Sequence, residues 1–371
     1  MIKNKIKVKR TPERIELLKQ IVSSDVAVSD AAKESVAAII GSALDQVLPL
    51  LASSSLIYRD FEFDQDSSPS LPLDLFEDVG ENYIKVWTQN IAGGQPTNLI
   101  HGMGEYKFST YRLDSAISFL NRYAKDARLD VLAKGIERMA QEIALKQEKN
   151  AYSVLLRAAA EAVDSAGNPH TLSATTAGVF QIHDLNRFIT NITRLHTAWN
   201  GGTPATLNRA GVTDFFVSPE RMQDIRAFAY QPMNTRAVPN TDESTALGLP
   251  DSVREKFFGT VGVPELYGKM FHQLLELGVG KSYTTLFDGF YSGTPTFDSA
   301  TQDLMLGLDL SVDAFLRPVA TAPTQDIDVT SQVVTMVDDQ FTKRQDQFGF
   351  YTRVEEGRII LDNKAIYSLF V

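Results

Sequence analysis

The stretch that decides the fold is "RLDVLAKGIERMAQEIALKQEKNAYSVLLRAAAEA", residues 128–162. It holds no proline and one glycine, and its apolar residues recur every three or four positions, which predicts one amphipathic helix. The apolar positions are Leu129, Leu132, Ile136, Met139, Ile143, Ala151, Leu155, Ala158 and Ala162. At 1.5 Å per residue this helix spans roughly 50 Å. A compact chain of this length has a radius of gyration of only about 21 Å, so the helix approaches the full width of the molecule.

The apolar stripe of this helix is narrow and ends in alanines, which favours a helix lying across a sheet. A helical bundle and a coiled coil are the alternatives. The coiled coil is disfavoured because Gln147 interrupts the seam and the flanking charges do not repeat. Gly135 costs about 1 kcal/mol relative to alanine in a helix, so we expect tertiary packing to hold that turn.

Composition limits the classes of protein that fit. The chain has 371 residues, 43% hydrophobic and 22% charged, which is typical of a globular protein of two or three domains. It has no cysteine, which excludes disulfides, thiol nucleophiles and cysteine-ligated metals. No apolar run is long enough to predict a membrane span, and the basic N-terminus lacks the apolar region of a secretory signal. The net charge of -10 argues against a nucleic-acid-binding protein.

Two segments concentrate charge. Residues 1–10 alternate basic and apolar side chains, which predicts an extended arm with one basic face, although a frayed terminus has the same pattern. The basic residues are Lys3, Lys5, Lys7, Lys9 and Arg10. Residues 60–81 hold eight carboxylates and no lysine or arginine. Either both segments are solvated, or they meet, within one subunit or between neighbours, in a salt-dependent contact.

The rest of the chain predicts a mixture of helices and strands. Alternation and glycines predict a long β-hairpin over 83–119 with its tip near 93–104. Ser218 and Pro219, after apolar residues 215–217, predict a strand that leads into a capped helix. Other expected helices are 12–23, 29–52, 180–199, 251–258 and 264–277, and other expected strands are 283–290, 303–319 and 327–338. The last residues, from 348 on, predict two or three strands with turns at 355–357 and 362–363.

The motifs that resemble chemistry are weak. "GVGKS" (278–282) lacks the first glycine of a phosphate-binding loop, where Leu275 stands. We expect a helix before it and a strand after it, which is the reverse of a phosphate-binding loop. The histidines (His101, His170, His183, His196 and His272) have no helical metal-ligand spacing, and no G-x-S-x-G elbow is present. We therefore predict no catalytic residue, no cofactor and no metal, and no enzyme.

The order of these parts resembles the HK97-type major capsid protein of tailed bacteriophages. The resemblance rests on residues 83–119 as an extended loop, 128–159 as a spine helix, 213–228 as an axial strand and helix, and 346–370 as closing strands. It implies an α+β, HK97-like capsid fold with peripheral and axial domains. The implied division is an N-terminal arm (1–55), an extended-loop region (56–120), a peripheral domain (121–180 and 335–371) and an axial domain (181–334).

The resemblance also implies a function and partners. The subunit would self-assemble as hexamers and pentamers into an icosahedral head in the virion, made in the host cytoplasm. The head would enclose dsDNA with weak contact to it. Scaffold, portal and decoration proteins would be further partners, and no membrane is involved. A projecting arm and hairpin cannot bury their own apolar residues, so neighbouring copies should cover them. The expected assembly residues are the five basic residues of the arm and Ile84, Val86, Trp87 and Phe108.

Two alternatives remain. An encapsulin-like nanocompartment shell would share the fold and carry an apolar pocket for a cargo peptide. A nucleotide-using enzyme built on residues 265–340 fits less well. The sequence leaves shell size and maturation open.

Overall fold

The computed structural model describes residues 11–23, 25–51, 53–64, 69–72, 105–126, 129–164, 167–176, 178–197, 211–227, 265–311, 313–324, 327–337 and 346–371. Contacts divide the chain into two compact units. The first unit comprises Met1–Ala151 and Leu316–Ile359, and the second comprises Tyr152–Phe315 and Ile360–Val371. The predicted arm, residues 1–10, lies outside the described residues.

The described part of the first unit contains a seven-stranded sheet with the order β1-β10-β13-β12, to which β4, β11 and β14 add as side pairs. Its strands are β1 (Arg59–Asp64), β4 (Tyr111–Leu120), β10 (Phe315–Thr324), β11 (Ile327–Ser331), β12 (Val334–Val337), β13 (Gln347–Glu356) and β14 (Ile359–Ile360). The longest ladder joins β4 and β13 in antiparallel register, from Gln347 opposite Leu120 to Glu356 opposite Tyr111. β1 is parallel to β10. The sheet therefore joins segments that are far apart in the sequence.

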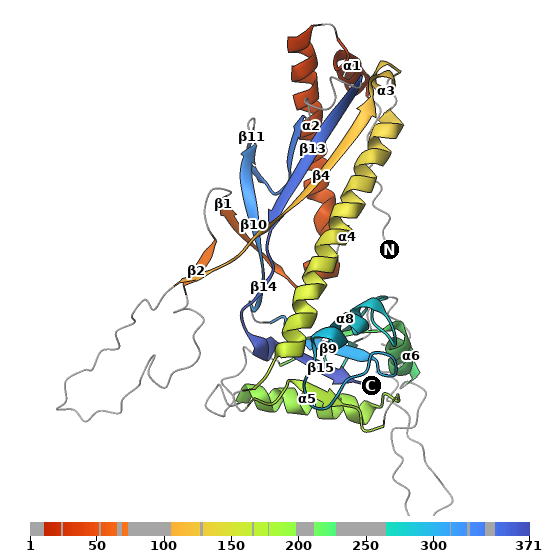
Figure 1. Ribbon diagram of the computed structural model, residues 1–371, viewed down its shortest axis with the longest axis vertical. Helices are drawn as coiled ribbons and strands as arrows, with labels where there is room; N and C mark the ends of the chain where they lie inside the picture. Colours follow the sequence, from red (N-terminus) through yellow and green to blue (C-terminus); the bar gives the residue numbers. More distant parts are fainter. Residues whose placement is uncertain are drawn as a thin grey trace, which may run out of the picture. The chain divides into compact units, whose positions relative to one another are not determined.

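Helices cover this sheet. They are α1 (Pro12–Gln20), α2 (Val26–Leu51), the 3-10 turn η1 (Ser53–Leu56), α3 (Asn121–Lys125) and α4 (Leu129–Glu161). The stripe of α4 packs into one core with Phe119 of β4 and with Phe348 and Phe350 of β13. Figure 1 shows α4 running alongside β4 and β13. The prediction of one long helix lying on a sheet is confirmed for the part of α4 in this unit.

Gly135 explains how closely α4 approaches the sheet. A Cβ atom at this position would lie 2.6 Å from Ile117 Cδ1 and 2.7 Å from Phe119 Cζ. Any larger residue would therefore push the helix away from β4 or distort two core side chains. The glycine that weakens the helix in isolation permits its tightest contact with the sheet.

A separate two-stranded sheet pairs β2 (Ser70–Pro72) with β3 (Glu105–Lys107) in antiparallel register. Pro72 lies opposite Glu105, so the described residues on either side of 73–104 are paired with each other. The predicted hairpin tip lies outside the described residues. β4 pairs with β13. The predicted pairing of residues 111–119 with the first half of that hairpin stays a prediction, because that half lies outside the described residues.

The described part of the second unit contains a six-stranded sheet with the order β5-β15-β9-β6-β8-β7. Its strands are β5 (Thr171–Ser173), β6 (Asp214–Val217), β7 (Glu265–Leu266), β8 (Lys269–Gln273), β9 (Leu304–Leu308) and β15 (Ile366–Phe370). Every residue of β9 and of β15 is buried, as expected for central strands covered on both faces.

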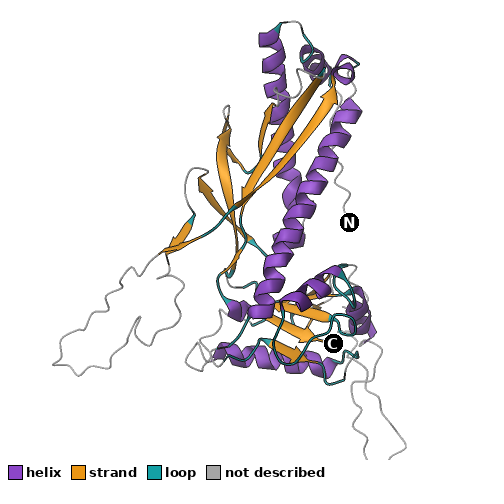
Figure 2. Cartoon of the chain, viewed as in Figure 1, coloured by secondary structure: helices purple, strands orange, loops and turns teal. Residues whose placement is uncertain are grey.

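Helices cover both faces of this sheet (Figure 2). They are α5 (Ile182–Thr197), α6 (Pro219–Ala227) and α8 (Ser282–Phe290), with the 3-10 turn η4 (Asn363–Ala365) before β15. Alternate residues of β15 face opposite ways: Tyr367 joins the core with Phe188 of α5, and the Phe370 ring lies 5.8 Å from that of Phe287 on α8. Ser218 caps α6 as predicted, its Oγ accepting from Arg221 N at 3.2 Å.

Several predicted elements are wrong or displaced. Residues 264–277 form β7 and β8 rather than a helix, because β8 pairs with β6 and β7. Residues 283–290 form α8 rather than a strand, because Tyr283 and Phe287, one helical turn apart, are both buried. The expected strand 303–319 is two strands, β9 and β10. α2 begins at Val26, before the expected position 29, because Asp25 Oδ1 accepts from Ala27 N at 3.1 Å. The expected helix at 251–258 lies outside the described residues.

The expected division into arm, extended loop, peripheral and axial domains stays a prediction. The expected peripheral domain took all of 335–371, but β15 pairs with β5 and β9 of the second unit. The break along the long helix falls between Ala151 and Tyr152. The expected turns at 355–357 and 362–363 do separate β13, β14 and β15.

Candidate functional site

The base of the predicted hairpin is the first candidate surface. The Phe108 ring meets the Phe61 ring edge-on at 6.4 Å, and Phe108 N donates to Pro69 O at 3.0 Å. Phe108 is only 8% exposed, so the expectation that its own subunit cannot bury it is wrong: β1 supplies the cover. Tyr106, two residues earlier, is 50% exposed. Of these two aromatic side chains, Tyr106 is therefore the exposed one and Phe108 the buried one.

The other expected assembly residues lie outside the described residues. They are Lys3, Lys5, Lys7, Lys9, Arg10, Ile84, Val86 and Trp87. Their role in assembly stays a prediction.

A buried polar cluster around Glu356 was not predicted from the sequence. Glu356 is fully buried, and its carboxylate accepts from Arg317 Nε at 2.9 Å, Gln147 Nε2 at 3.0 Å and Tyr111 Oη at 2.8 Å. Arg358 Nη1 lies 3.2 Å from the same carboxylate. Burial, followed by the Glu356 charge, raises the pKa of Tyr111 above its usual range, so the phenol remains a donor.

The cluster joins four elements of the first unit: α4, β4, β10 and β13. Arg317 also reaches the half-exposed Asp60 of β1, at 3.2 Å. A buried carboxylate that holds two guanidinium groups is costly to desolvate but specifies one arrangement of its partners. Gln147, which interrupts the apolar stripe of the helix, is the one sequence signal that indicated this cluster. The Glu356 cluster therefore holds α4, β4, β10 and β13 together.

A second buried carboxylate lies in the other unit. Asp303 accepts from the Ser218 hydroxyl and from Arg221 Nε at 3.2 Å, and its other oxygen accepts from Leu304 N at 2.8 Å. Burial raises the pKa of Asp303 above its ordinary value, against the opposing effect of Ser218 and Arg221. The cluster ties the start of α6 to the strand β9. Ser218 serves as a cap and a donor here, not as an activated nucleophile.

The glycine-rich turn at 278–282 lies between strand β8 and helix α8. The sequence predicted the reverse order, a helix before the turn and a strand after it. Three of the turn's five backbone N–H groups, and that of Tyr283 just after it, nevertheless donate within the chain. Gly278 N donates to Thr284 Oγ1, Gly280 N to Ser299 O, Lys281 N to Gly278 O and Tyr283 N to Glu276 O. A phosphate needs such N–H groups turned outward. The reason given from the sequence is therefore wrong, because a helix does follow Lys281, and the absence of a phosphate site stays a prediction.

The described histidines are structural. His272 Nε2 lies 2.7 Å from Asp214 Oδ1 on the neighbouring strand β6, and His183 is exposed on α5. His170 Nδ1 lies 3.1 Å from Asn363 O and 3.3 Å from Ile366 O. In the described ranges, no group of three histidine, aspartate or glutamate side chains could hold a metal ion. No described helix is both long and apolar enough to cross a membrane.

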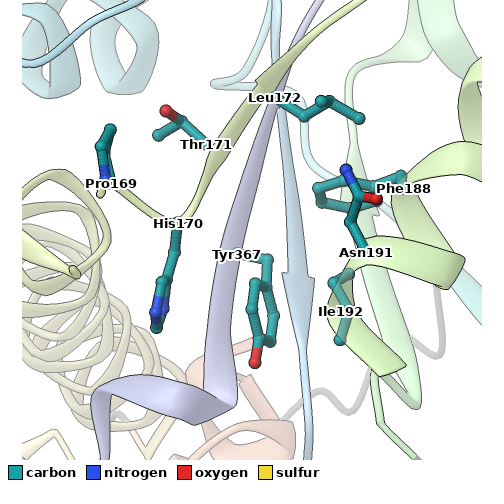
Figure 3. A pocket seen from close by; sticks show the side chains of 8 residues that line it. All are labelled: Pro169, His170, Thr171, Leu172, Phe188, Asn191, Ile192 and Tyr367. Carbon is teal, nitrogen blue, oxygen red and sulfur yellow. The ribbon is translucent and has the colours of Figure 1, made fainter. Parts of the chain in front are cut away.

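A cavity of about 300 Å³ lies at the β5 edge of the second unit's sheet. Figure 3 shows its lining: Pro169, His170, Thr171 and Leu172 at β5, Phe188, Asn191 and Ile192 on α5, and Tyr367 on β15. The rings of His170 and Tyr367 stack at 5.1 Å. Carbonyl oxygens only accept, so Nδ1 of His170 carries the proton and Nε2 is an acceptor. Burial lowers the pKa of His170, which keeps the ring neutral.

No sequence profile of a known protein family matches this chain, and no curated protein matches it. Several solved structures are similar to it. The chain is similar to phage capsid proteins. The capsid of the empty GTA particle has a TM-score of 0.48 and 12% identity, covering 86% of this chain and 90% of that one. The mature capsid of bacteriophage PhiM1 has a TM-score of 0.47 and 9% identity, covering 86% of both chains. The holo-SrpI encapsulin complex from Synechococcus elongatus has a TM-score of 0.38 and 9% identity, covering 86% of this chain and 87% of that one.

Proposed function

We propose that this chain is the major subunit of a phage head, a structural protein that assembles through contacts between its own copies. The observation that carries the proposal is the β2–β3 ribbon. It belongs to neither large sheet, and it pairs Pro72 with Glu105, the described residues on either side of 73–104. An isolated two-stranded ribbon is marginally stable in water. With Tyr106 half exposed and Ile84, Val86 and Trp87 in the segment it closes, such a ribbon needs cover from another molecule.

The order of the remaining elements supports the same proposal. A helix of 33 residues lies partly on the first unit's sheet, and an α/β unit with a capped strand-to-helix turn follows. In this proposal the fold is HK97-like. The first unit supplies the peripheral part, the second unit the axial part, and residues 1–10 an arm that overlaps a neighbour. Hexamers and pentamers of the chain would close an icosahedral shell around dsDNA in the virion.

Further proposed partners are scaffold, portal and decoration proteins, with synthesis in the host cytoplasm. The acidic net charge of -10 suits a shell that touches packaged DNA only weakly. The proposed role is structural rather than catalytic. Four described carboxylates are buried: Asp184, Asp303, Asp309 and Glu356. Each accepts hydrogen bonds from neighbouring groups, and only Oδ2 of Asp309 has no partner among the described residues.

Sedimentation and negative-stain microscopy of the purified chain test the proposal. Over a range of salt and protein concentration we expect rings, sheets or closed shells. A species that stays monomeric under every condition would refute the proposal. Tyr106→Ser should weaken assembly without unfolding the chain, whereas Leu145→Ser, which removes an apolar side chain of similar exposure from α4, should not weaken it.

The encapsulin-like shell is the second candidate, favoured by the cavity beside β5, which could accept a cargo peptide. Both shells assemble, so their contents separate them. Particles recovered from the natural source should hold dsDNA if the chain forms a phage head. An enclosed protein without DNA would instead identify a nanocompartment.

A further inference from the structure

The turn between β7 and β8 carries an unusual residue. Leu266 pairs with Lys269, so Tyr267 and Gly268 form a two-residue turn, with φ angles of 54° and 72°. Two positive φ angles define a type I′ turn, whose usual first residue is asparagine, aspartate or glycine. A bulky side chain there is strained. Tyr267 is nevertheless 51% exposed, so packing within the described residues covers only about half of this strained residue.

The opposite edge of the same sheet holds the cavity beside β5. β7 and β5 are the two ends of the strand order. A cavity of roughly 150 Å³ is enough to bind benzene, and this one measures about 300 Å³. Phe188, Ile192 and Tyr367 supply apolar walls, and His170 Nε2 supplies an acceptor. A phenol, with an apolar ring and one donor hydroxyl, matches this lining.

We infer that Tyr267 of one copy of this chain inserts into the β5 cavity of the next copy. Because the ring and the cavity lie at opposite edges of one sheet, the contact is heterologous: each copy donates at one edge and receives at the other. Repeating this contact produces a closed ring if the rotation from one copy to the next is a whole fraction of a full turn. Within the described ranges no strand pairs with the outer side of β5 or of β7, and unpaired edges of this kind are used for contacts between chains.

This inference rests on the proposed function and identifies the contact that joins copies into a capsomer. It also explains why the strained tyrosine is kept. An asparagine would satisfy the turn better, but it could not fill an apolar cavity. The same cavity could instead hold a cargo peptide or a small molecule, and the experiments below distinguish these occupants.

The first experiment removes the inserted ring. Tyr267→Asn should relieve backbone strain, so the urea midpoint of the unassembled chain should stay the same or rise. The protein concentration required for assembly should rise roughly tenfold or more, as for other buried tyrosines at the centres of interfaces. Leu275→Asn is the matched control: Leu275 is 63% exposed and lies on neither sheet edge, so its loss should leave assembly unchanged.

The second experiment fills the cavity. Asn191 is exposed and lines the cavity, so Asn191→Trp should occupy it without disturbing the core. We expect the same loss of assembly as for Tyr267→Asn. Asn186→Trp places the same bulk on an exposed position of the same helix, away from the cavity lining, and should assemble normally.

The third experiment uses the absence of cysteine from the chain. Tyr267→Cys and Asn191→Cys are made in separate chains, which are mixed and treated with a short bis-maleimide. Because Tyr267→Cys itself removes the inserted ring, the mixture is held at a protein concentration well above the assembly threshold, which this loss raises roughly tenfold. A covalent dimer should form only in the mixture. The double variant should give a ladder of linked chains that ends at the ring size.

The outcomes separate the two proposals. Normal assembly of Tyr267→Asn and of Asn191→Trp, with no linked dimer, would overturn the inference and leave the shell function standing. Loss of assembly only for Asn191→Trp, without linkage, would assign the cavity to another occupant and also overturn the inference. Failure of the unmodified chain to assemble under any condition would overturn both.

Discussion

Gly135 offers the sharpest test of how the long helix is held on its sheet. In an isolated helix, Gly135→Ala should stabilise by about 1 kcal/mol, because glycine has the poorer helix propensity. In this chain the added Cβ would lie 2.6 Å from Ile117 Cδ1 and 2.7 Å from Phe119 Cζ. Overpacking of this kind costs about 1–3 kcal/mol. The two effects together predict a net loss of about 1 kcal/mol.

Gly41 provides a matched control in α2 of the same unit. A Cβ there would lie 3.5 Å from Thr335 Oγ1 and 3.6 Å from Val333 O, which are ordinary contact distances. Gly41→Ala should therefore stabilise by about 0.5–1 kcal/mol. The two glycine-to-alanine changes should move the free energy of unfolding in opposite directions.

Urea unfolding followed by circular dichroism measures both variants at one low protein concentration, so that assembly does not contribute to apparent stability. Ile117→Val removes the clashing methyl group. It should cost about 0.5–1.5 kcal/mol alone but less in the Gly135→Ala background, a coupling that a double-mutant cycle detects. Equal stabilisation by Gly135→Ala and Gly41→Ala would refute the close contact between α4 and β4.

Three further predictions follow from the buried polar groups and the glycine-rich turn. Glu356→Gln leaves Arg317 and Arg358 without their buried carboxylate and should lower the free energy of unfolding in urea by about 3–5 kcal/mol. Asp60→Asn removes a partly exposed ion pair and should lower it by less than about 1 kcal/mol. Equal losses of stability would contradict the structural role of Glu356. Burial lowers the pKa of His170 in the folded chain below the ordinary 6.5. As the pH falls, the imidazole is therefore protonated in the unfolded chain before it is protonated in the folded chain. The stability that His170 contributes is present above the unfolded pKa of 6.5 and is lost as the pH falls below it. Unfolding midpoints at about pH 7 and about pH 5 should therefore differ more for the unmodified chain than for His170→Asn, and an equal difference would exclude His170 as the cause. Lys281→Ala should leave particle yield unchanged, and calorimetric titration of the unmodified chain with ATP should give no binding heat, because the N–H groups of Gly278, Gly280 and Lys281 donate within the chain. Saturable ATP binding that Lys281→Ala abolishes would restore the phosphate site.

Short-range sequence patterns were enough to predict the helices and strands that depend mainly on neighbouring residues. The long helix, the capped helix after Ser218 and the strands that end the chain follow from periodicity, caps and turn residues. These signals involve residues a few positions apart, which the sequence states directly.

The errors occurred where a distant partner overrides local preference. Residues 269–273 read as a helix but form a strand, because β6 supplies their hydrogen bonds across more than fifty positions of sequence. Tyr283–Phe290 has strand-like composition but is a helix, because Phe297 and Phe370 cover one of its faces. Phe108 was expected to need a neighbour's cover, but Phe61 covers it.

The sequence by itself determined the α+β class, the long amphipathic helix and the absence of cysteine chemistry, because each depends on composition or on short-range periodicity. Only the tertiary structure decided the Glu356 cluster, the cavity beside β5 and the place of Tyr267 at the opposite edge. Each of these brings together residues that are far apart along the chain, and strand order and register, which place them, are set by pairing energies summed over the whole sheet.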